Sequence, residues 1–469
     1  MTDTSWQPSL TGGQGPKYLA LSRALRDAVR RGDLPEGTQL PPVRDLAWRL
    51  GVTPGTVARA YQIGTQDGLL EAVVGRGTFV AARTAKLGPV EPLHVEARDV
   101  TRAGAPAIDM RSPSLPDVGQ TAAISAALHR VADRVDQEYL GYPSLKQDRA
   151  LRSLMADWLS DRALGAVGAD DIALTFGGQN AIVTALQICL RGDRPAVFCE
   201  ELTYPGFRHA IRLNRGEVVP IAMDDFGMRA DALDAACRKT GGRVVCLTPE
   251  AQNPTAVRMP PERRAEIVRV ARTHDLQIIE DDCYSVADAV IPSLRAVAPE
   301  RTWHLASLSK SIAAGLRFGA IVAPAGLGEA ARVALQHGFF GLSRPLADIV
   351  EELMQSGDAQ RLKLAVREDF ARRLQIALNA LGRYQVTWQP GLSFLWLRLP
   401  SGWRASTFTR QAEGLGVLIR SADEYALVDG HAPNAVRIAL AGNVTIERFE
   451  GAMNTLARLL DNPSGDLAM

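Results

Sequence analysis

Apolar residues near the start of the chain recur with the spacing of α-helices. Leu21, Leu25 and Ala28 are four and three residues apart, so they lie on one face of a first predicted helix. A second helix is predicted over residues 43–50, where a proline precedes the apolar positions and a glycine follows them. Thr53 is a favoured cap for a third helix, which a short glycine-containing turn separates from the second. Helix, turn and helix in this order predict a helix-turn-helix.

A β-hairpin is predicted after the third helix. Residues 69–74 and 78–80 are rich in apolar and β-branched side chains, and a Gly-Arg-Gly turn at 75–77 separates them. We therefore expect a winged module, with Arg76 at the tip of the wing.

The rest of the chain has a different pattern. From about residue 124, helical stretches alternate with short apolar runs, which is typical of an α/β domain with a mainly parallel sheet. Proline-rich sequence with little periodicity separates the two patterns. We predict a winged helical module over residues 1–82, a linker over 83–116 and an α/β domain over 117–469.

The charge of the chain is unevenly distributed. Residues 17–86 contain eleven Lys or Arg against six Asp or Glu, a balance of +5, and since the whole chain carries +1 the remainder carries −4. A basic module on a mildly acidic body indicates that only the first module meets a polyanion.

Cysteine usage and hydropathy restrict the compartment. The five cysteines are scattered and form no Cys-x-x-Cys motif, which favours a reducing compartment and argues against structural zinc. The start of the chain has no signal-peptide pattern, and no apolar run approaches the roughly 20 residues that cross a bilayer. We therefore expect a cytoplasmic protein with no metal and no membrane partner.

Polar residues follow four of the short apolar runs. The residues that follow the runs at 196–199, 244–247, 276–279 and 303–305 include Tyr204, Asn253, Asp281, Tyr284, Ser307, Ser309 and Lys310. In open α/β sheets, ligands bind outside the carboxyl ends of the strands. We therefore expect an aromatic ring, an amide, a carboxylate, a phenol and a lysine to meet in one crevice.

These side chains match the needs of pyridoxal 5′-phosphate. A lysine binds the aldehyde as a Schiff base, and Lys310 is the candidate. A carboxylate must face the pyridine nitrogen for the ring to act as an electron sink, and Asp281 directly ends its predicted strand. Asn253 and Tyr284 are expected to donate to the phenolic oxygen of the ring, and Tyr204 is expected to stack on its face.

The phosphate of this cofactor needs backbone N–H groups at a helix start and a cation. Gly178 and Gln179 belong to the predicted helix start, and Arg317 is the candidate cation, aided by the hydroxyls of Ser307 and Ser309. Each of these residues alone has an ordinary interpretation, such as a solvated lysine, a capping aspartate or a turn. Their joint occurrence in this order favours a cofactor site.

The first module resembles a known family of regulators. Segments 37–47, 50–61 and 75–80 are similar to the winged helix-turn-helix of the GntR family. The resemblance implies contacts with double-stranded DNA, through Arg44, Thr56, Arg59 and Arg76. Arginine suits this role because it can bind phosphate or read guanine with two hydrogen bonds. A helical module that only serves dimerisation is the alternative.

The second domain resembles the fold-type I, class I/II aminotransferases. The resemblance spans roughly residues 108–460, with motifs at 249–255, 280–284 and 307–319. It implies that Arg437 binds the α-carboxylate of an amino-acid ligand through a bidentate fork. It also implies that Tyr142 reaches the phosphate in a neighbouring subunit. A surface ion pair is the alternative role for Arg437.

Together the two domains resemble the MocR subfamily of GntR-type transcriptional regulators. The subfamily implies a protein that senses pyridoxal phosphate or a small amino compound and changes its grip on operator DNA. It also implies a homodimer, assembled head to tail. The combination favours regulation without net catalysis. One alternative is a working pyridoxal-phosphate-dependent aminotransferase with a DNA-binding module, and another is a DNA-binding protein whose large domain only dimerises.

Overall fold

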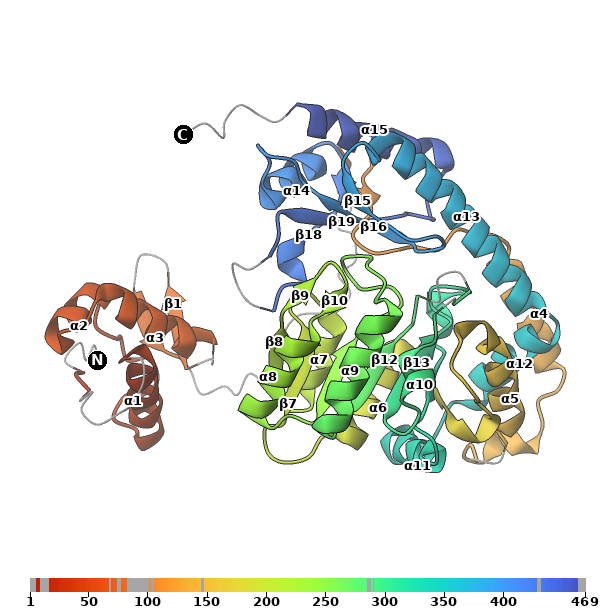
Figure 1. Ribbon diagram of the computed structural model, residues 1–469, viewed down its shortest axis with the longest axis horizontal. Coiled ribbons are helices and arrows are strands. Elements are labelled where there is room, and N and C mark those ends of the chain that lie inside the picture. The colour runs from red at the N-terminus through yellow and green to blue at the C-terminus, as the bar shows by residue number, and fades with distance from the viewer. Residues whose placement is uncertain are drawn as a thin grey trace. The chain divides into compact units, whose positions relative to one another are not determined.

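Three helices and a β-hairpin form the first part of the chain in the computed structural model (Figure 1). The helices are α1 (Lys17–Arg31), α2 (Val43–Leu50) and α3 (Pro54–Gln66), and the antiparallel strands are β1 (Leu70–Val73) and β2 (Gly77–Val80). The apolar faces of the helices pack together, with Leu21, Val57 and Ala60 fully buried. Gly51 ends α2 in the left-handed conformation, at a φ of 61°. The predicted winged helix-turn-helix fold is confirmed.

The chain divides into two compact units, Met1–Glu91 and Pro92–Met469, and each is described by itself. The structure describes residues 6–8, 17–66, 69–73, 77–81, 101–102, 105–144, 147–284, 288–289, 291–427 and 432–462. Arg76, at the predicted tip of the wing, lies outside the described residues.

A seven-stranded sheet forms the centre of the second unit. In spatial order its strands are β6 (Ile172–Thr175), β14 (Gly319–Val322), β13 (Thr302–Ser307), β12 (Gln277–Asp281), β11 (Val244–Leu247), β7 (Ala196–Glu200) and β8 (Glu217–Ile221). Strand β14 is antiparallel to both of its neighbours, and the other strand pairs are parallel. The expected α/β domain with a mainly parallel sheet is confirmed.

Helices cover both faces of this sheet, because successive strand residues point to opposite faces. Val197 and Cys199 of β7 pack on one layer, which consists of α6 (Gly177–Cys189), α7 (Pro205–Leu213) and α11 (Gly328–Phe339). Phe198, between them, packs on the other layer, which consists of α8 (Ala230–Thr240), α9 (Pro261–Thr273) and α10 (Leu294–Val297). We call the sheet and its helices the large lobe.

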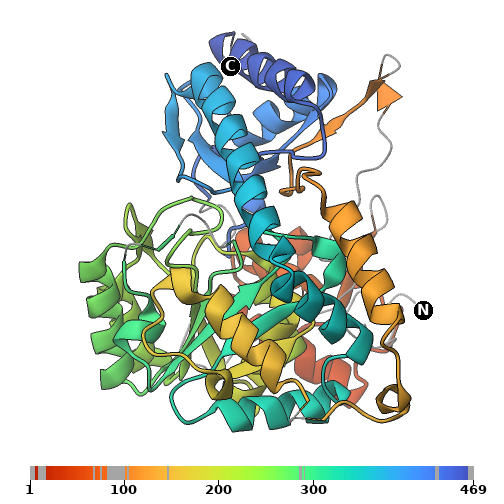
Figure 2. The ribbon, with the colours of Figure 1, turned by 90° about the vertical axis from the view of Figure 1, so that its right-hand side faces the viewer.

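A smaller lobe follows, and a long helix connects it to the large lobe (Figure 2). Its antiparallel sheet has the order β15 (Gln385–Thr387), β16 (Phe394–Arg398), β19 (Ala435–Ala439) and β18 (Arg420–Ser421), with α14 (Ala405–Gly414) and α15 (Ile446–Asp461) packed on it. The connecting helix is α13 (Asp358–Leu381). Leu362, near its start, packs in the core of the large lobe, whereas Phe370 packs in the core of the small lobe.

Residues 108–116, which the sequence places in the linker, pack against the small lobe. Strand β5 (Ile108–Asp109) pairs in parallel with β17 (Val417–Leu418), and Met110 is fully buried. The backbone N–H of Gly442 donates to the carbonyl of Ser114 at 3.0 Å. The packed part of the second unit therefore begins before residue 117. The sequence contains no sign of this, because a two-residue strand among prolines has too little periodicity to be recognised.

The remaining helices pack on the large lobe, and the remaining short strands form two separate antiparallel pairs. They are α4 (Gln120–Ala132), α5 (Arg149–Trp158) and α12 (Arg344–Gln355), with the short strands β3 (Thr101–Arg102), β4 (Ala105–Pro106), β9 (Met223–Asp224) and β10 (Gly227–Met228). Within the described residues, no helix is long and apolar enough to cross a membrane. The same residues contain no cluster of three His, Cys, Asp or Glu side chains that could hold a metal ion.

We predict that Phe449→Ala destabilises the second unit by about 3–5 kcal/mol, because a buried phenyl ring would leave a cavity in the core of the small lobe. The free energy of unfolding, from urea titration followed by tryptophan fluorescence, measures this. Phe226→Ala is the matched control: Phe226 is 54% exposed, and its removal should change the free energy by less than about 0.5 kcal/mol. Equal effects of the two substitutions would contradict the assigned core.

Candidate functional site

Four parallel strands of the large lobe end at the same edge of the sheet. Strands β7, β11, β12 and β13 are parallel, so the residues that follow them lie at one edge. The structure brings Asn253 and Tyr284 together there, with the Asn253 amide donating to the Tyr284 hydroxyl at 3.5 Å. Nearby negative charge on Asp281 contributes to raising the pKa of both Tyr204 and Tyr284, although burial is the main cause. The residues that follow these strands thus share one site.

Lys310 lies in the turn after β13 and is half-buried. Its Nζ donates to the carbonyl of Pro113 at 3.2 Å. Burial and the positive charges of Arg437 and Arg317 together lower the pKa of this amine to about 8, although Cys283 opposes part of the change. The amine therefore loses its proton far more readily than an exposed lysine, which suits a nucleophile that must attack an aldehyde.

Asp281 is the last residue of β12, and its carboxylate faces the site without a basic partner. Its Oδ1 accepts the backbone N–H of Cys283 at 2.9 Å, and within the described residues no ion pair involves it. Burial raises the pKa of this carboxyl, and the hydrogen bonds from Cys283 offset part of that effect. A buried carboxylate of this kind suits a protonated pyridine nitrogen, whose positive charge would stabilise the ionised form.

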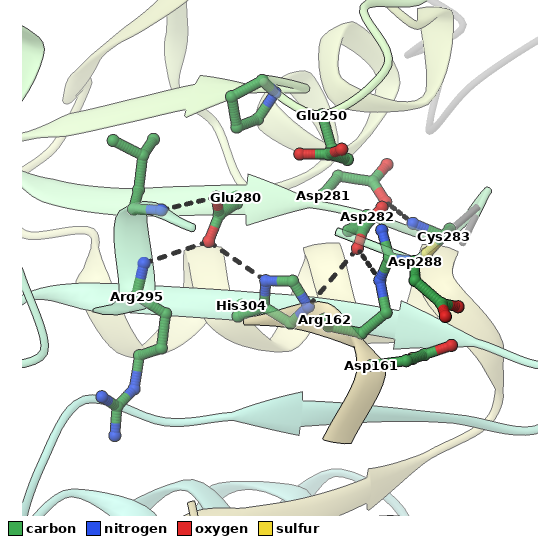
Figure 3. Close-up of polar contacts among 12 residues, drawn as sticks. Asp161, Arg162, Glu250, Glu280, Asp281, Asp282, Cys283, Asp288, Arg295 and His304 are labelled. Carbon is green, nitrogen blue, oxygen red and sulfur yellow. Dashed lines mark hydrogen bonds and ion pairs between the residues drawn. The ribbon is translucent and has the colours of Figure 1, made fainter. Parts of the chain in front are cut away.

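A buried polar network supports the end of β12 from behind (Figure 3). Glu280 accepts the backbone N–H groups of Leu294 and Arg295 at 2.9 and 3.2 Å, and its Oε2 lies 3.0 Å from Nδ1 of His304. Asp282 pairs with Arg162 at 2.8 Å, with both side chains almost fully buried. This network has no local signal in the sequence, because its directly paired side chains are up to 120 residues apart. It fixes the residues on both sides of Asp281.

The start of α6 and Arg317 form a cradle for an anion. Arg317 adopts the left-handed conformation at a φ of 49°, and its guanidinium donates to the carbonyl of Phe176 at 3.3 Å and to the Ser309 hydroxyl at 3.4 Å. Ser307 in turn donates to Ser309 at 3.0 Å. Gly177 has a φ of 80°, which favours glycine, and a Cβ there would lie 2.7 Å from the guanidinium. Backbone N–H groups, hydroxyls and an arginine match a phosphate dianion.

The two remaining predicted cofactor residues of this region contact each other. The Tyr204 hydroxyl donates to Oε1 of the Gln179 side chain at 3.3 Å. The side-chain amide of Gln179 donates to the backbone carbonyl of Gly206 at 3.1 Å. A Cβ on Gly178, one residue before Gln179, would lie 2.4 Å from the sulfur of Cys283. The first turn of α6 therefore approaches the end of β12 more closely than any side chain at this position would allow.

Arg437 of β19 enters the site from the small lobe. Its Nη1 donates to the side chain of Asn253 at 2.7 Å, and its Nη2 donates to the carbonyl of Arg111 at 2.7 Å. The guanidinium lies 5.0 Å from the ring centres of both Phe394 and Tyr425. Its Nε is buried with no acceptor among the described residues. An unpaired donor on a buried guanidinium is what a ligand carboxylate would satisfy.

Tyr142 does not join this site within one chain. Its side chain is 79% exposed, and its ring stacks on Phe340 with the centroids 4.8 Å apart and the planes at 23°. The resemblance assigned Tyr142 to a neighbouring subunit, and its exposure is compatible with that role.

The predicted DNA contacts of the first unit differ in how they are held. Arg44 on α2 and Arg59 on α3 are exposed, and the Arg59 guanidinium lies over the ring of Tyr18, 5.1 Å from its centroid. Thr56 is half-buried, and its hydroxyl lies 3.0 Å from that of Thr53, the residue that precedes α3.

Glu200, at the end of β7, is a buried acid that the sequence analysis missed. Burial raises the pKa of its carboxyl to about 7, although a hydrogen bond from Gln252 at 3.1 Å opposes this effect. Gln252 directly precedes Asn253, so Glu200 helps to place the loop that carries this site residue. A charged residue directly after the apolar run 196–199 was the only signal in the sequence.

Comparisons with known proteins match both units. Residues 17–80 match the model of bacterial regulatory proteins of the gntR family, and residues 108–456 match that of aminotransferase class I and II. An uncharacterised HTH-type transcriptional regulator of Bacillus subtilis, YdeF, is 30% identical over 98% of this chain and 97% of its own. The pyridoxine biosynthesis regulator PdxR of Corynebacterium glutamicum is 28% identical, covering 77% of this chain and 78% of its own.

Two further comparisons concern the subfamily and the fold. The probable rhizopine catabolism regulatory protein MocR of Rhizobium meliloti is 25% identical over 80% of this chain and 78% of its own. A crystal structure of a Pyrococcus horikoshii kynurenine aminotransferase superposes with a TM-score of 0.67 at 22% identity, covering 77% of this chain and 92% of that one. This likeness shows the fold of the second unit.

A winged helix-turn-helix joined to an aminotransferase-type unit defines a DNA-binding transcription regulator whose cofactor is pyridoxal 5′-phosphate. The chain belongs to the MocR-type subfamily of the GntR family, and its second unit belongs to the class I and II aminotransferase family.

We predict that the cofactor attaches to Lys310 faster as the pH rises toward about 8, and that the rate levels off above this value. The neutral amine is the reactive form, and its fraction rises until the pKa is passed. Mixing the cofactor-free protein with pyridoxal phosphate in a stopped-flow spectrometer measures the rate.

Arg437→Met removes a positive charge that lowers this pKa, so the midpoint should move to higher pH. Arg229→Met is the control, because the exposed Arg229 pairs with Asp231 and has no contact with the site. A wild-type midpoint at the ordinary lysine value of 10.5 would contradict the lowered pKa.

Proposed function

We propose that this regulator responds to pyridoxal phosphate and to an amino compound that binds at Lys310 and Arg437. The observation that carries the proposal is the buried guanidinium of Arg437, whose Nε has no acceptor among the described residues, in the same site as Lys310. An amine and an acid group on one ligand would satisfy both residues. Such a ligand is an amino acid, including one in which a short spacer separates the amine from the acid group.

The cofactor supplies an aldehyde for amines and an electron-accepting ring. In our proposal, Lys310 holds the aldehyde carbon, and Asp281 holds the proton on the ring nitrogen. Asn253 and Tyr284 hydrogen-bond the phenolic oxygen, and Tyr204 covers one face of the ring. The lowered pKa of Lys310 keeps a reactive fraction of neutral amine near neutral pH.

The cradle at the start of α6 is proposed to hold the phosphate. Gly178 and Gln179 contribute backbone N–H groups, Ser307 and Ser309 contribute hydroxyls, and Arg317 contributes the cation. The hydrogen bond between Arg317 and Ser309 supports this assignment, because it already places the cation beside a hydroxyl.

We further propose a head-to-tail homodimer in which Tyr142 reaches the phosphate of the neighbouring subunit. Leu140 and Tyr142 are 88% and 79% exposed, and Tyr142 stacks on Phe340, which is itself 59% exposed. Adjacent exposed apolar side chains mark an interaction surface, and the same patch on both copies suits a two-fold dimer.

The proposed contacts with operator DNA are made by Arg44, Thr56, Arg59 and Arg76. The exposure of Arg44 and Arg59 supports their assignment. We take residues 1–82 as the DNA-binding module, 83–116 as the connection and 117–469 as the ligand-binding domain, with β5 showing that the packed part of the connection starts at Ile108.

An active aminotransferase is the second candidate function. The observation that favours it is Lys310, whose pKa of about 8 suits an amine that takes up and returns a proton. Sustained keto-acid formation from an amino donor, absent in Lys310→Ala, would favour this function over sensing.

We predict that pyridoxal phosphate changes the affinity of the protein for its own promoter by about 5- to 150-fold, because a coupling of 1–3 kcal/mol is typical of two linked sites. Footprinting and fluorescence anisotropy with and without the cofactor measure this change. The name of the Corynebacterium relative, a regulator of pyridoxine biosynthesis, supports the choice of ligand. Lys310→Ala should bind DNA with one affinity in both conditions. A wild-type affinity that ignores both the cofactor and amino acids would refute sensing.

We also predict that Arg59→Ala weakens specific DNA binding by about 5- to 150-fold, as expected for the loss of an arginine that contacts a base. Anisotropy titration of a promoter fragment against a scrambled fragment gives the specific affinity. Arg229→Ala, in the second unit, is the control of equal charge change. Unchanged binding by Arg59→Ala would show that the DNA-contacting face of α3 is misassigned.

A further inference from the structure

We infer that residues 109–114, which lie near the start of the second unit, form a wall of the ligand site and report its occupancy to the DNA-binding module. We call them the reporter segment. The inference rests on the proposed function for the roles of Lys310 and Arg437. It adds two backbone carbonyls to the ligand site, as acceptors for Arg437 and Lys310. Because every residue has a backbone carbonyl, the sequence cannot reveal such acceptors.

The two key side chains of the ligand site each donate to this segment. Arg437 Nη2 lies 2.7 Å from the carbonyl oxygen of Arg111, and Lys310 Nζ lies 3.2 Å from that of Pro113. Arg420 Nε donates to the same Arg111 oxygen at 3.0 Å. Both lone pairs of this carbonyl are therefore in use, one of them by the proposed effector-binding arginine.

Among the residues that the structure describes, the other hydrogen bonds and ion pairs of the reporter segment are made with the small lobe or within the segment. The backbone N–H of Met110 donates to Leu418 at 2.8 Å, and the carbonyl of Met110 accepts the N–H of Ala439 at 2.9 Å. Asp109 accepts the backbone N–H of Arg111 at 2.9 Å and pairs with its guanidinium at 2.9 Å. The Arg111 carbonyl is thus placed by the Asp109–Arg111 pair as well as by Arg437.

Ligand binding competes with these contacts. A carboxylate that binds Nε and Nη2 of Arg437 in a bidentate grip uses the Nε that lacks an acceptor in the described part of the chain, and removes one of the two donors from the Arg111 carbonyl. Attachment of the lysine nitrogen to the cofactor reduces the number of protons it can donate to Pro113. Both events release the segment that is joined, through the chain before it, to the DNA-binding module. A ligand can shift DNA affinity only through contacts that differ between two states, and these two contacts do.

The test separates the carboxylate from the rest of the ligand. Pyridoxamine 5′-phosphate and N-(5′-phosphopyridoxyl)-L-alanine both bind without attachment to Lys310, but only the second carries a carboxylate for Arg437. Hydrogen–deuterium exchange of full-length protein, read in peptides that cover the reporter segment, should be about 2- to 10-fold faster with the alanine adduct, as expected for the loss of about one hydrogen bond. In Arg437→Met the two ligands should give equal exchange.

A pair of matched variants tests the link to DNA. Asp109→Asn removes the charge that orders the reporter segment, so the difference in DNA affinity between the two ligands should fall below about twofold. Asp231→Asn breaks an Arg–Asp pair of the same two-residue spacing on the exposed start of α8, and it should leave that difference as in the wild type. Asp231→Asn should also bind the alanine adduct as tightly as the wild type, and both variants are compared at saturating concentrations of each ligand.

The outcomes distinguish this inference from the proposed function. If the adduct changes DNA affinity but leaves exchange in the reporter segment unaltered, the relay runs elsewhere and the inference is overturned. If hydrogen–deuterium exchange in the reporter segment changes but DNA affinity does not, the segment responds to the ligand, and the proposed sensing function is refuted. Equal exchange with both ligands in a wild type that binds the adduct overturns the inference in every case.

Discussion

A buried hydrogen bond at the ligand site joins the small lobe of the second unit to its large lobe. Arg437 of the small lobe donates to Asn253 of the large lobe at 2.7 Å. Taking a guanidinium out of water costs several kcal/mol unless good acceptors surround it. Asn253, the Arg111 carbonyl and the rings of Phe394 and Tyr425 provide that surrounding here. Because they come from four separate parts of the chain, the position of Arg437 depends on how all four are packed.

The charges of the site explain why it suits a phosphate and a carboxylate together. Arg317 and Arg437 both lower the pKa of Lys310, so the site carries more positive charge than its own acids balance. A phosphate at Arg317 and a carboxylate at Arg437 would each offset part of this repulsion. Asp281 is the opposite case, since burial raises its pKa and a positively charged ring would lower it again. The cofactor and the proposed effector would therefore balance charges in the site that the protein alone leaves unbalanced.

The sequence predicted those parts of the fold and the site that follow from local rules. The winged helix-turn-helix followed from helix periodicity, caps and a glycine turn, and the gathering of Asn253, Asp281 and Lys310 followed from strand ends in a parallel sheet. The network of Glu280, His304, Asp282 and Arg162 was out of reach, because buried charges find partners across the fold rather than along the chain. The packed segment 108–116 was also missed, because its contacts use backbone atoms, which every residue has.

This chain can act as a regulator without having lost any residue that an enzyme of this fold would use. Lys310, Asp281 and Asn253 all lie at or after strand ends of the large lobe, where their proposed roles would require them. A regulator needs only a coupling of about 1–3 kcal/mol between two sites, which is the net contribution of one or two hydrogen bonds. Arg437 and Lys310 make two such hydrogen bonds, to the carbonyls of Arg111 and Pro113. A complete ligand site can therefore control DNA binding once the chain that lines it continues into a DNA-binding module.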